Sequence, residues 1–298
     1  MGNKRKNLLL IVVSIFVILI VGAFFALWNP EPPPPVQMPM PNGYTLLAQA
    51  GTLVEKQTGN FATMDPVQLR SLVDANSNAL QTARSGLSEK SRVPLEFSQR
   101  YASQHIYELQ QIRMLAYAFL AEGKVAELEN RTNDAARAYL DAARLGINSR
   151  RGGPLIDNLV GIAEEVMGTA QLQKLVPNLD AKTTAEAARE LEALDASKET
   201  WDQILQNEKH WVRGMYPGLQ YRITELVTSI ELRASKAKAR QKYEAQQNKT
   251  RRLILDLAAH AYELDKGHRP TNAADLVPAY LKAAPIDPIT GKEMKLTP

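Results

Sequence analysis

The sequence predicts an all-α protein with a membrane-anchoring helix at its N-terminus. Three observations support this fold class: an uncharged apolar run at residues 8–28, a proline-rich run at residues 29–41, and apolar residues at helical spacing from residue 65 onward. No stretch shows the strict alternation that is typical of a sheet. We therefore expect an N-terminal transmembrane helix, a Pro-rich linker, a bundle of helical hairpins and a small turn-rich C-terminal module.

The first expected element is the cytoplasmic basic start and signal anchor at residues 1–28. About 20 apolar residues suffice to cross ~30 Å of hydrocarbon as a helix. Lys4, Arg5 and Lys6 precede the span and no basic cluster follows it directly, so the positive-inside rule places the N-terminus in the cytoplasm. A cleaved signal peptide is the alternative, although no small-x-small cleavage site follows the run. Trp28 would lie at the membrane interface.

The next segment, residues 29–64, is expected to be a Pro-rich linker and irregular chain. Proline lacks the N–H of a helix or central strand, so residues 29–41 favour a polyproline II stalk of roughly 40 Å. Residues 65–264 are expected to form six or seven helices. Their expected boundaries are starts at Asp65-Pro66, Pro94, Thr132 or Asn133, Gly152-Gly153-Pro154 and the capping box Thr183–Glu186, and stops at Gly146 and Pro217.

Residues 114–145 resemble a single helix pair of the tetratricopeptide type. Gly123 stands where two helices would approach, and small and aromatic residues such as Tyr139 would pack against it. No second copy follows at that period, so ordinary helix packing is the other interpretation.

Composition excludes several classes of protein and site. Three of the 36 basic residues precede the span, which leaves 33 basic and 32 acidic residues in the rest of the chain. That balance gives no electrostatic footprint for nucleic acid. The basic run at 233–243 is expected to be an exposed helix face. The chain has no cysteine, so disulfides and thiolate metal sites are excluded.

A few polar residues could carry chemistry. Asp256, His260 and Glu263 are spaced to share one helix face, where they could bind a cation or act in acid–base chemistry, or simply form a solvated face. His105 and Glu108 repeat part of that spacing. His210, which is flanked by Lys209 and Trp211, could act as an aromatic anchor beside a surface charge. Arg150 and Arg151 stand just before the helix start at Gly152-Gly153-Pro154, so an anion could bind there, or the segment is only a helix start. No motif assigns a catalytic or cofactor-binding residue.

The C-terminal residues 265–298 predict a compact module. Gly267 should end a helix, Thr271 should cap a short one that Pro278 ends, and turns should form at Asp287-Pro288 and Thr290-Gly291. This order resembles the tail of type II secretion pseudopilins; the matched residues are Tyr262, Gly267, Pro270, Leu276, Pro278, Tyr280, Pro285, Asp287, Pro288 and Gly291. The resemblance implies that Asp287 is a calcium ligand. The N-terminus lacks the G-F-T-L-x-E processing pattern of pseudopilins.

Residues 149–177 and 262–296 also resemble uncharacterised, membrane-anchored α-helical proteins of planctomycetes and related bacteria, a family without an assigned activity. We expect a single-pass inner-membrane protein whose bulk is periplasmic or extracytoplasmic. Its exported helical domain would act in protein–protein interaction or scaffolding, with another protein or a like subunit as partner. The alternatives are an accessory component of a secretion or pilus-like system, and a hydrolase with a site near His260.

Overall fold

The computed structural model describes residues 2–27, 36–55, 63–216 and 219–296, and side chains within these ranges except at 2–10, 25–27, 99 and 219–232. The all-α prediction is confirmed, since the only pairing of extended segments in these ranges is one antiparallel bridge between Ile286 and Glu293. The helices are α1 Gly2–Leu27, α2 Gly43–Leu53, α3 Pro66–Ala75, α4 Ser77–Ser88, α5 Gln99–Leu128, α6 Thr132–Asn148, α7 Leu155–Leu175, α8 Ala181–Ala196, α9 Trp201–Met215 and α10 Leu219–Lys266, with 3-10 turns η2 Val176–Asn178 and η3 Ala273–Leu276.

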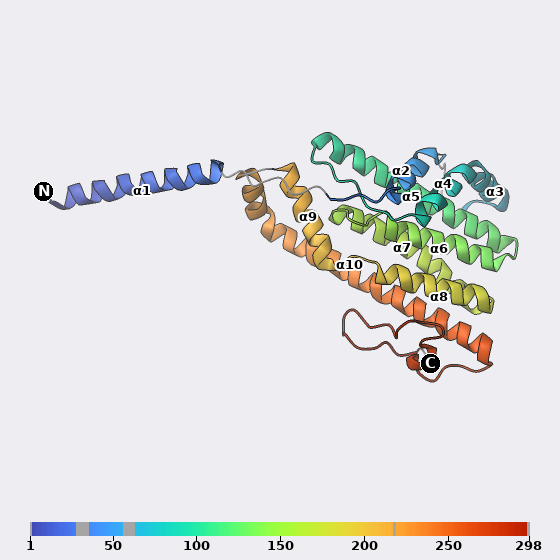
Figure 1. The fold of residues 1–298 in the computed structure, drawn as a ribbon. Coiled ribbons are helices and arrows are strands. Elements are labelled where there is room, and N and C mark those ends of the chain that lie inside the picture. The colour runs from blue at the N-terminus through green and yellow to red at the C-terminus, as the bar shows by residue number, and fades with distance from the viewer. Residues whose placement is uncertain (1, 28–35, 56–62, 217–218, 297–298) are drawn as a thin grey trace.

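The longer helices lie side by side in a stack (Figure 1). The stack runs from α5 through α6 and α7 to α8 and α10, and the short helices α2, α3 and α4 cover its α5 end. The C-terminal tail packs beneath α10 at the other end. Helix α1 stands apart from the stack. The body of eight described helices, α3 to α10, exceeds the six or seven that we predicted.

Helix α1 forms over the apolar run, and its described side chains, from Ile11 to Phe24, are exposed. Among the described residues, no helix is long and apolar enough to cross a membrane. The predicted anchor therefore stays a prediction. Trp28 and the proline run up to residue 35 lie outside the described residues.

The segment expected to be irregular up to residue 64 contains helix α2, so the linker prediction is wrong there. The Asn42 side chain caps α2 by accepting a hydrogen bond from the backbone N–H of Tyr44. Tyr44, Leu47 and Ala50 are fully buried in the main core because they follow one face of the helix. The remainder of that segment, residues 56–62, is not described.

Several predicted helix boundaries are confirmed. Asp65 caps α3 through a capping box with Gln68, and Pro66 occupies the first turn. Pro154 directly precedes α7, and α10 ends at Lys266 before Gly267, whose φ of 75° is the left-handed conformation that glycine favours. Local chemistry therefore sets these ends. The predicted interruption at Pro217 lies outside the described residues.

Other predicted boundaries are wrong because a neighbouring residue takes the role. Helix α5 begins at Gln99 after the cap Ser98, not at Pro94, and α8 is capped by Asp180 rather than by Thr183. Helix α6 has no side-chain cap from Thr132 or Asn133; Asn133 instead hydrogen-bonds Asp180. The 3-10 turn η3 is capped by Asn272 rather than Thr271.

Gly146 does not end α6, which continues to Asn148, because this glycine lies at a backbone contact between α6 and α7. A Cβ atom at Gly146 would lie 2.3 Å from the carbonyl oxygen of Gly161, and one at Gly168 would lie 2.4 Å from that of Tyr139. The predicted close approach at Gly123 is confirmed, since the Tyr139 ring packs directly against it. Glycines thus allow the central helices to pack closely.

The C-terminal tail shares the main hydrophobic core with the helices. Leu276, Leu281 and Met294 are buried in that core. The Glu192 carboxylate accepts hydrogen bonds from the backbone N–H groups of Lys282 and Ala283, at 2.8 and 3.2 Å. The predicted turns are confirmed, with Gly291 at a φ of 68°. The tail is therefore an integral layer of the stack.

Candidate functional site

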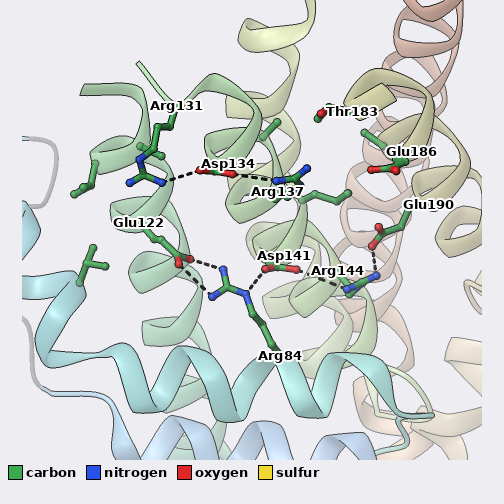
Figure 2. Close-up of a pocket in the computed structure, with 16 residues that line it drawn as sticks. Arg84, Glu122, Arg131, Asp134, Arg137, Asp141, Arg144, Thr183, Glu186 and Glu190 are labelled. Atoms are coloured by element: carbon green, nitrogen blue, oxygen red, sulfur yellow. Dashed lines mark hydrogen bonds and ion pairs between the residues drawn. The ribbon is translucent and has the colours of Figure 1, made fainter. Parts of the chain in front are cut away.

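A charged groove of about 610 Å³ lies on the surface formed by α4, α5, α6 and α8 (Figure 2). Helix α6 turns its alanine-rich face to the core, so Asp134, Arg137, Asp141 and Arg144, at i, i+3, i+7 and i+10, lie on the opposite face. Helix α8 contributes Glu186 and Glu190, which are four residues apart and so lie on one face of that helix.

Ion pairs connect these side chains into two chains across the groove. In the first, Arg84 donates to Glu122 at 2.5 Å and to Asp141 at 2.8 Å, and Arg144 links Asp141 to Glu190. In the second, Asp134 accepts from Arg131 and Arg137 at 2.8 and 3.0 Å. The groove therefore presents alternating charges (Figure 2).

Burial and neighbouring charges shift the pKa values of several groove residues. Burial raises the pKa of the Asp141 carboxyl, although Arg84 and Arg144 oppose this change. Burial likewise raises the pKa of Glu190. Burial lowers the pKa of Arg84, but its hydrogen bonds to Glu122 and Asp141 outweigh burial and raise it overall. These partly desolvated pairs are held by their mutual contacts.

The residues His105 and Glu108 do not form a solvated face. His105 is buried, and its Nε2 lies 2.8 Å from Oδ1 of the buried Asp157 on α7. Its Nδ1 lies 3.3 Å from the Tyr44 hydroxyl and 3.4 Å from that of Tyr101. Burial lowers the pKa of His105, but the bond to Asp157 outweighs burial and raises it overall. This cluster joins α2, α5 and α7.

A buried acidic pair on α7 is a feature that our sequence analysis missed. Glu164 and Glu165 are both fully buried. Glu165 accepts hydrogen bonds from Arg150 and Lys198, each at 2.7 Å, and from Thr250 at 2.5 Å. A carboxylate pair between Gly161 and Gly168, on a helix whose glycines mark a close contact, was the signal available in the sequence.

The two neighbouring carboxyls have opposite pKa shifts. Burial raises the pKa of Glu164 to about 8, because a single hydrogen bond from Ser149 at 3.2 Å only partly offsets it. Burial also raises the pKa of Glu165, but the charges of Lys198 and Arg150 outweigh burial and bring it to about 2. Glu164 is thus neutral at pH 7 while Glu165 is ionised.

The residues predicted on one face of α10 do line a common groove. Asp256, His260 and Glu263 border a space of about 640 Å³ that residues of η2 and the tail also line. Nε2 of His260 is buried and has no hydrogen-bond partner. Asp256 accepts a hydrogen bond from Gln173 at 3.1 Å, and Glu263 lies 3.4 Å from Arg269.

The predicted anion site before α7 is occupied by the protein's own carboxylates, so that hypothesis is wrong. Glu199 accepts from the backbone N–H of Gly152 at 2.9 Å, and Glu208 accepts from that of Leu155 at 2.8 Å. Arg150 pairs with Glu165, and Arg151 donates to Ser197. The positive end of the helix is therefore already neutralised.

The structure places Asp287, the implied calcium ligand, in an exposed turn. One of its carboxylate oxygens accepts hydrogen bonds from the backbone N–H groups of Ile289 and Thr290, at 2.7 and 3.1 Å, and these bonds lower its pKa. In the described part of the chain, no group of three or more histidine, aspartate or glutamate residues could hold a metal ion. The calcium assignment stays a prediction.

The remaining predicted features lie around α9 and α10. His210 contacts the Phe97 ring at 5.6 Å and borders a groove of about 480 Å³ that Val36 and Met38 also line. Burial lowers the pKa of His210, and the nearby Arg92 adds to this effect. The basic run at 233–243 is confirmed as a largely exposed helix face. Compared with protein-family models, curated proteins and solved structures, the chain matches none of them.

Proposed function

We propose that the protein is a single-span, membrane-anchored scaffold whose helical domain binds a partner protein or a second copy of itself. The observation that carries this proposal is the groove of alternating charges between α4, α5, α6 and α8. Complementary charges across an interface select the partner and fix its register. The groove fits a protein segment that carries both acidic and basic side chains.

The energetics of the groove favour exchange of its ion pairs with those of a partner. The ion pairs of Asp134 with Arg131 and Arg137 are the exposed ones, and such pairs contribute only ~0–1 kcal/mol each, so opening them costs little. The Arg137 side chain is 57% exposed and forms an ion pair only with Asp134 among the described side chains, while the Glu186 side chain is 54% exposed. These two residues are the positions where a partner's charges can pair without disturbing the core.

The anchor in this proposal rests on residues 8–28. A helix that is apolar all round belongs either in a protein core or in a membrane, and the described side chains of α1 are exposed. The basic residues Lys4, Arg5 and Lys6 favour a cytoplasmic N-terminus and a helical domain on the opposite side of the membrane.

The test is crosslinking and affinity purification of the full chain from its native membranes. We expect a specific partner, or crosslinked copies of the chain, with the wild-type protein and not with the double variant Arg137→Glu, Glu186→Lys. The variant Lys209→Glu, at an exposed position on α9 outside the groove, serves as the control and should keep the partner. Equal recovery of the same partner by the groove variant would disprove this binding role of the groove.

A second candidate function is a hydrolase site in the groove around His260. One observation favours it: Asp256, His260 and Glu263 line the same space, whose volume of about 640 Å³ lies in the usual range for small-molecule sites. Screening ester and amide substrates with the wild-type protein and His260→Ala tests this role. Turnover that is the same in both proteins would exclude a catalytic role for His260.

A further inference from the structure

The first turns of α10 whose side chains are described carry a dense basic strip, defined here as Arg233, Lys236, Lys238, Arg240 and Lys242. Four of these residues are exposed and Lys236 is half-buried. Ala239 and Tyr243 are buried against the stack, and Lys236, three and seven residues before them, borders the same face. The four exposed strip residues therefore lie on the sides of the helix that face away from the stack, with Arg233 and Arg240 on one side and Lys238 and Lys242 on the other.

The strip has few carboxylates near it. Glu244 accepts a hydrogen bond from Arg240 at 2.7 Å, and Asp202 on α9 adds a weaker attraction to the same guanidinium. The other strip residues form no ion pair with any described side chain. The strip thus has an excess of positive charge, unlike the balanced groove of Figure 2.

The covalent chain keeps this strip close to the end of α1. Val36 and Met38 line the same groove as Gln206 and His210 of α9, so the chain reaches α9 by residue 36. Eight residues lie between Leu27 and Val36, and the nine steps from one to the other span at most ~32 Å when fully extended. The end of α1 therefore lies at most ~32 Å from the position of Val36, which borders the groove of α9.

Helix α9 in turn runs alongside the strip. The Tyr243 hydroxyl donates to the backbone carbonyl of Glu199 at 2.7 Å, and its ring lies 5.9 Å from that of Trp201. From that contact, α9 continues to its C-terminal end at Met215, and the strip leads back to the N-terminal end of α10 at Leu219. These two ends are four residues apart in sequence, so both segments extend in the same direction. Figure 1 shows α9 and the first half of α10 on the side of the stack nearest α1.

From this geometry we infer that the basic strip docks on anionic lipid headgroups of the membrane that holds α1. The inference rests on the proposed anchor. The strip lies more than 200 residues after the span, too far along the chain to affect the topology rule, which counts basic residues near the span. Basic residues near an anionic surface are attracted within about one Debye length, ~10 Å at 0.1 M salt. Docking would hold the charged groove in a defined orientation above the membrane.

The absence of cysteine makes a site-specific test direct. Ala237 is exposed at the centre of the strip, so Ala237→Cys introduces a unique position for a fluorophore. The labelled full chain is reconstituted into nanodiscs of phosphatidylcholine alone or mixed with phosphatidylglycerol, each containing a lipid with a nitroxide quencher on its headgroup. We expect at least twofold stronger quenching in the anionic nanodiscs, and loss of the difference in high salt.

Two charge variants decide whether the strip is responsible. The triple variant Lys236→Gln, Lys238→Gln, Lys242→Gln should lose the extra quenching. The matched variant Lys90→Gln, Lys124→Gln, Lys182→Gln removes the same charge from exposed positions elsewhere and should keep it. A chain that fails to enter nanodiscs would overturn the anchor itself. A chain that enters them but is quenched equally in both lipids, or a strip variant that keeps the extra quenching, would overturn the docking inference alone.

Discussion

The pH dependence of stability should reveal the buried Glu164, and the substitution Glu164→Gln isolates its contribution. The folded-state pKa of about 8 lies above the ordinary value of 4.5 because burial disfavours the charged form. The folded protein therefore holds a proton that the unfolded chain releases. Stability from this proton is fully present below pH 4.5 and is lost as the pH rises through about 8.

The size of the effect follows from the two pKa values. Linkage between them gives a loss of about 2.5 kcal/mol in the free energy of unfolding when the pH rises from 5 to 7. The neutral amide of Glu164→Gln cannot ionise, so this contribution disappears in the variant. With a urea slope of about 3 kcal/mol per molar, the midpoint difference between variant and wild type should change by about 0.8 M over that interval.

Urea unfolding of the full chain in detergent, followed by circular dichroism at pH 5 and pH 7, measures this difference. The neighbouring substitution Glu165→Gln is the matched control. Because its folded-state pKa of about 2 lies below the ordinary value of 4.5, the stability from its ionised form is present above pH 4.5 and is lost only as the pH falls toward 2, so its effect should be nearly the same at pH 5 and pH 7. If the difference in urea midpoint between Glu164→Gln and wild type were equal at the two pH values, Glu164 would not be protonated in the folded protein.

Three further substitutions test the packing and the polar core. Gly161→Ala should destabilise the protein by about 3 kcal/mol in urea unfolding, because its new Cβ would lie 2.3 Å from the carbonyl oxygen of Gly146. Glu165→Gln should cost about 3–5 kcal/mol at pH 7, since it leaves the buried Arg150 guanidinium without its carboxylate partner, and thermal unfolding measures the loss. Leu276→Ala in the tail should cost about 2–5 kcal/mol in urea unfolding if the tail is part of the core, and a negligible change would show a separable tail.

Local signals in the sequence were enough to predict the fold class and several helix ends. Asp65, Pro154 and Gly267 act through their own side chain or backbone, so their roles can be inferred from a few neighbours. Gly146 shows where this reasoning stops. A glycine near the end of a helical pattern is typical of a helix stop. Here the glycine permits contact with Gly161 on the next helix. This role depends on tertiary packing, which the neighbouring sequence does not reveal.

The charged groove could be predicted only in part. Asp134, Arg137, Asp141 and Arg144 follow one face of α6 at helical spacing, and that stripe is visible in the sequence. The ion pair between this stripe and Arg84 on α4 is not visible in the sequence, because Arg84 and Asp141 are 57 residues apart in the chain. Alternating charges on one helix are consistent with plain solvent exposure, and only the arrangement of four helices makes them a groove.

The acidic pair on α7 shows most clearly why a polar site can escape sequence reasoning. Glu164 and Glu165 are chemically identical neighbours, and nothing within the helix distinguishes them. Their difference comes from distant residues, since Lys198 and Thr250 reach Glu165 from 33 and 85 residues away. One carboxyl is thereby paired and ionised, while the other receives a single hydroxyl and keeps its proton. The same substitution at adjacent positions should therefore shift stability in different pH ranges, a contrast that a solvated helix face could not produce.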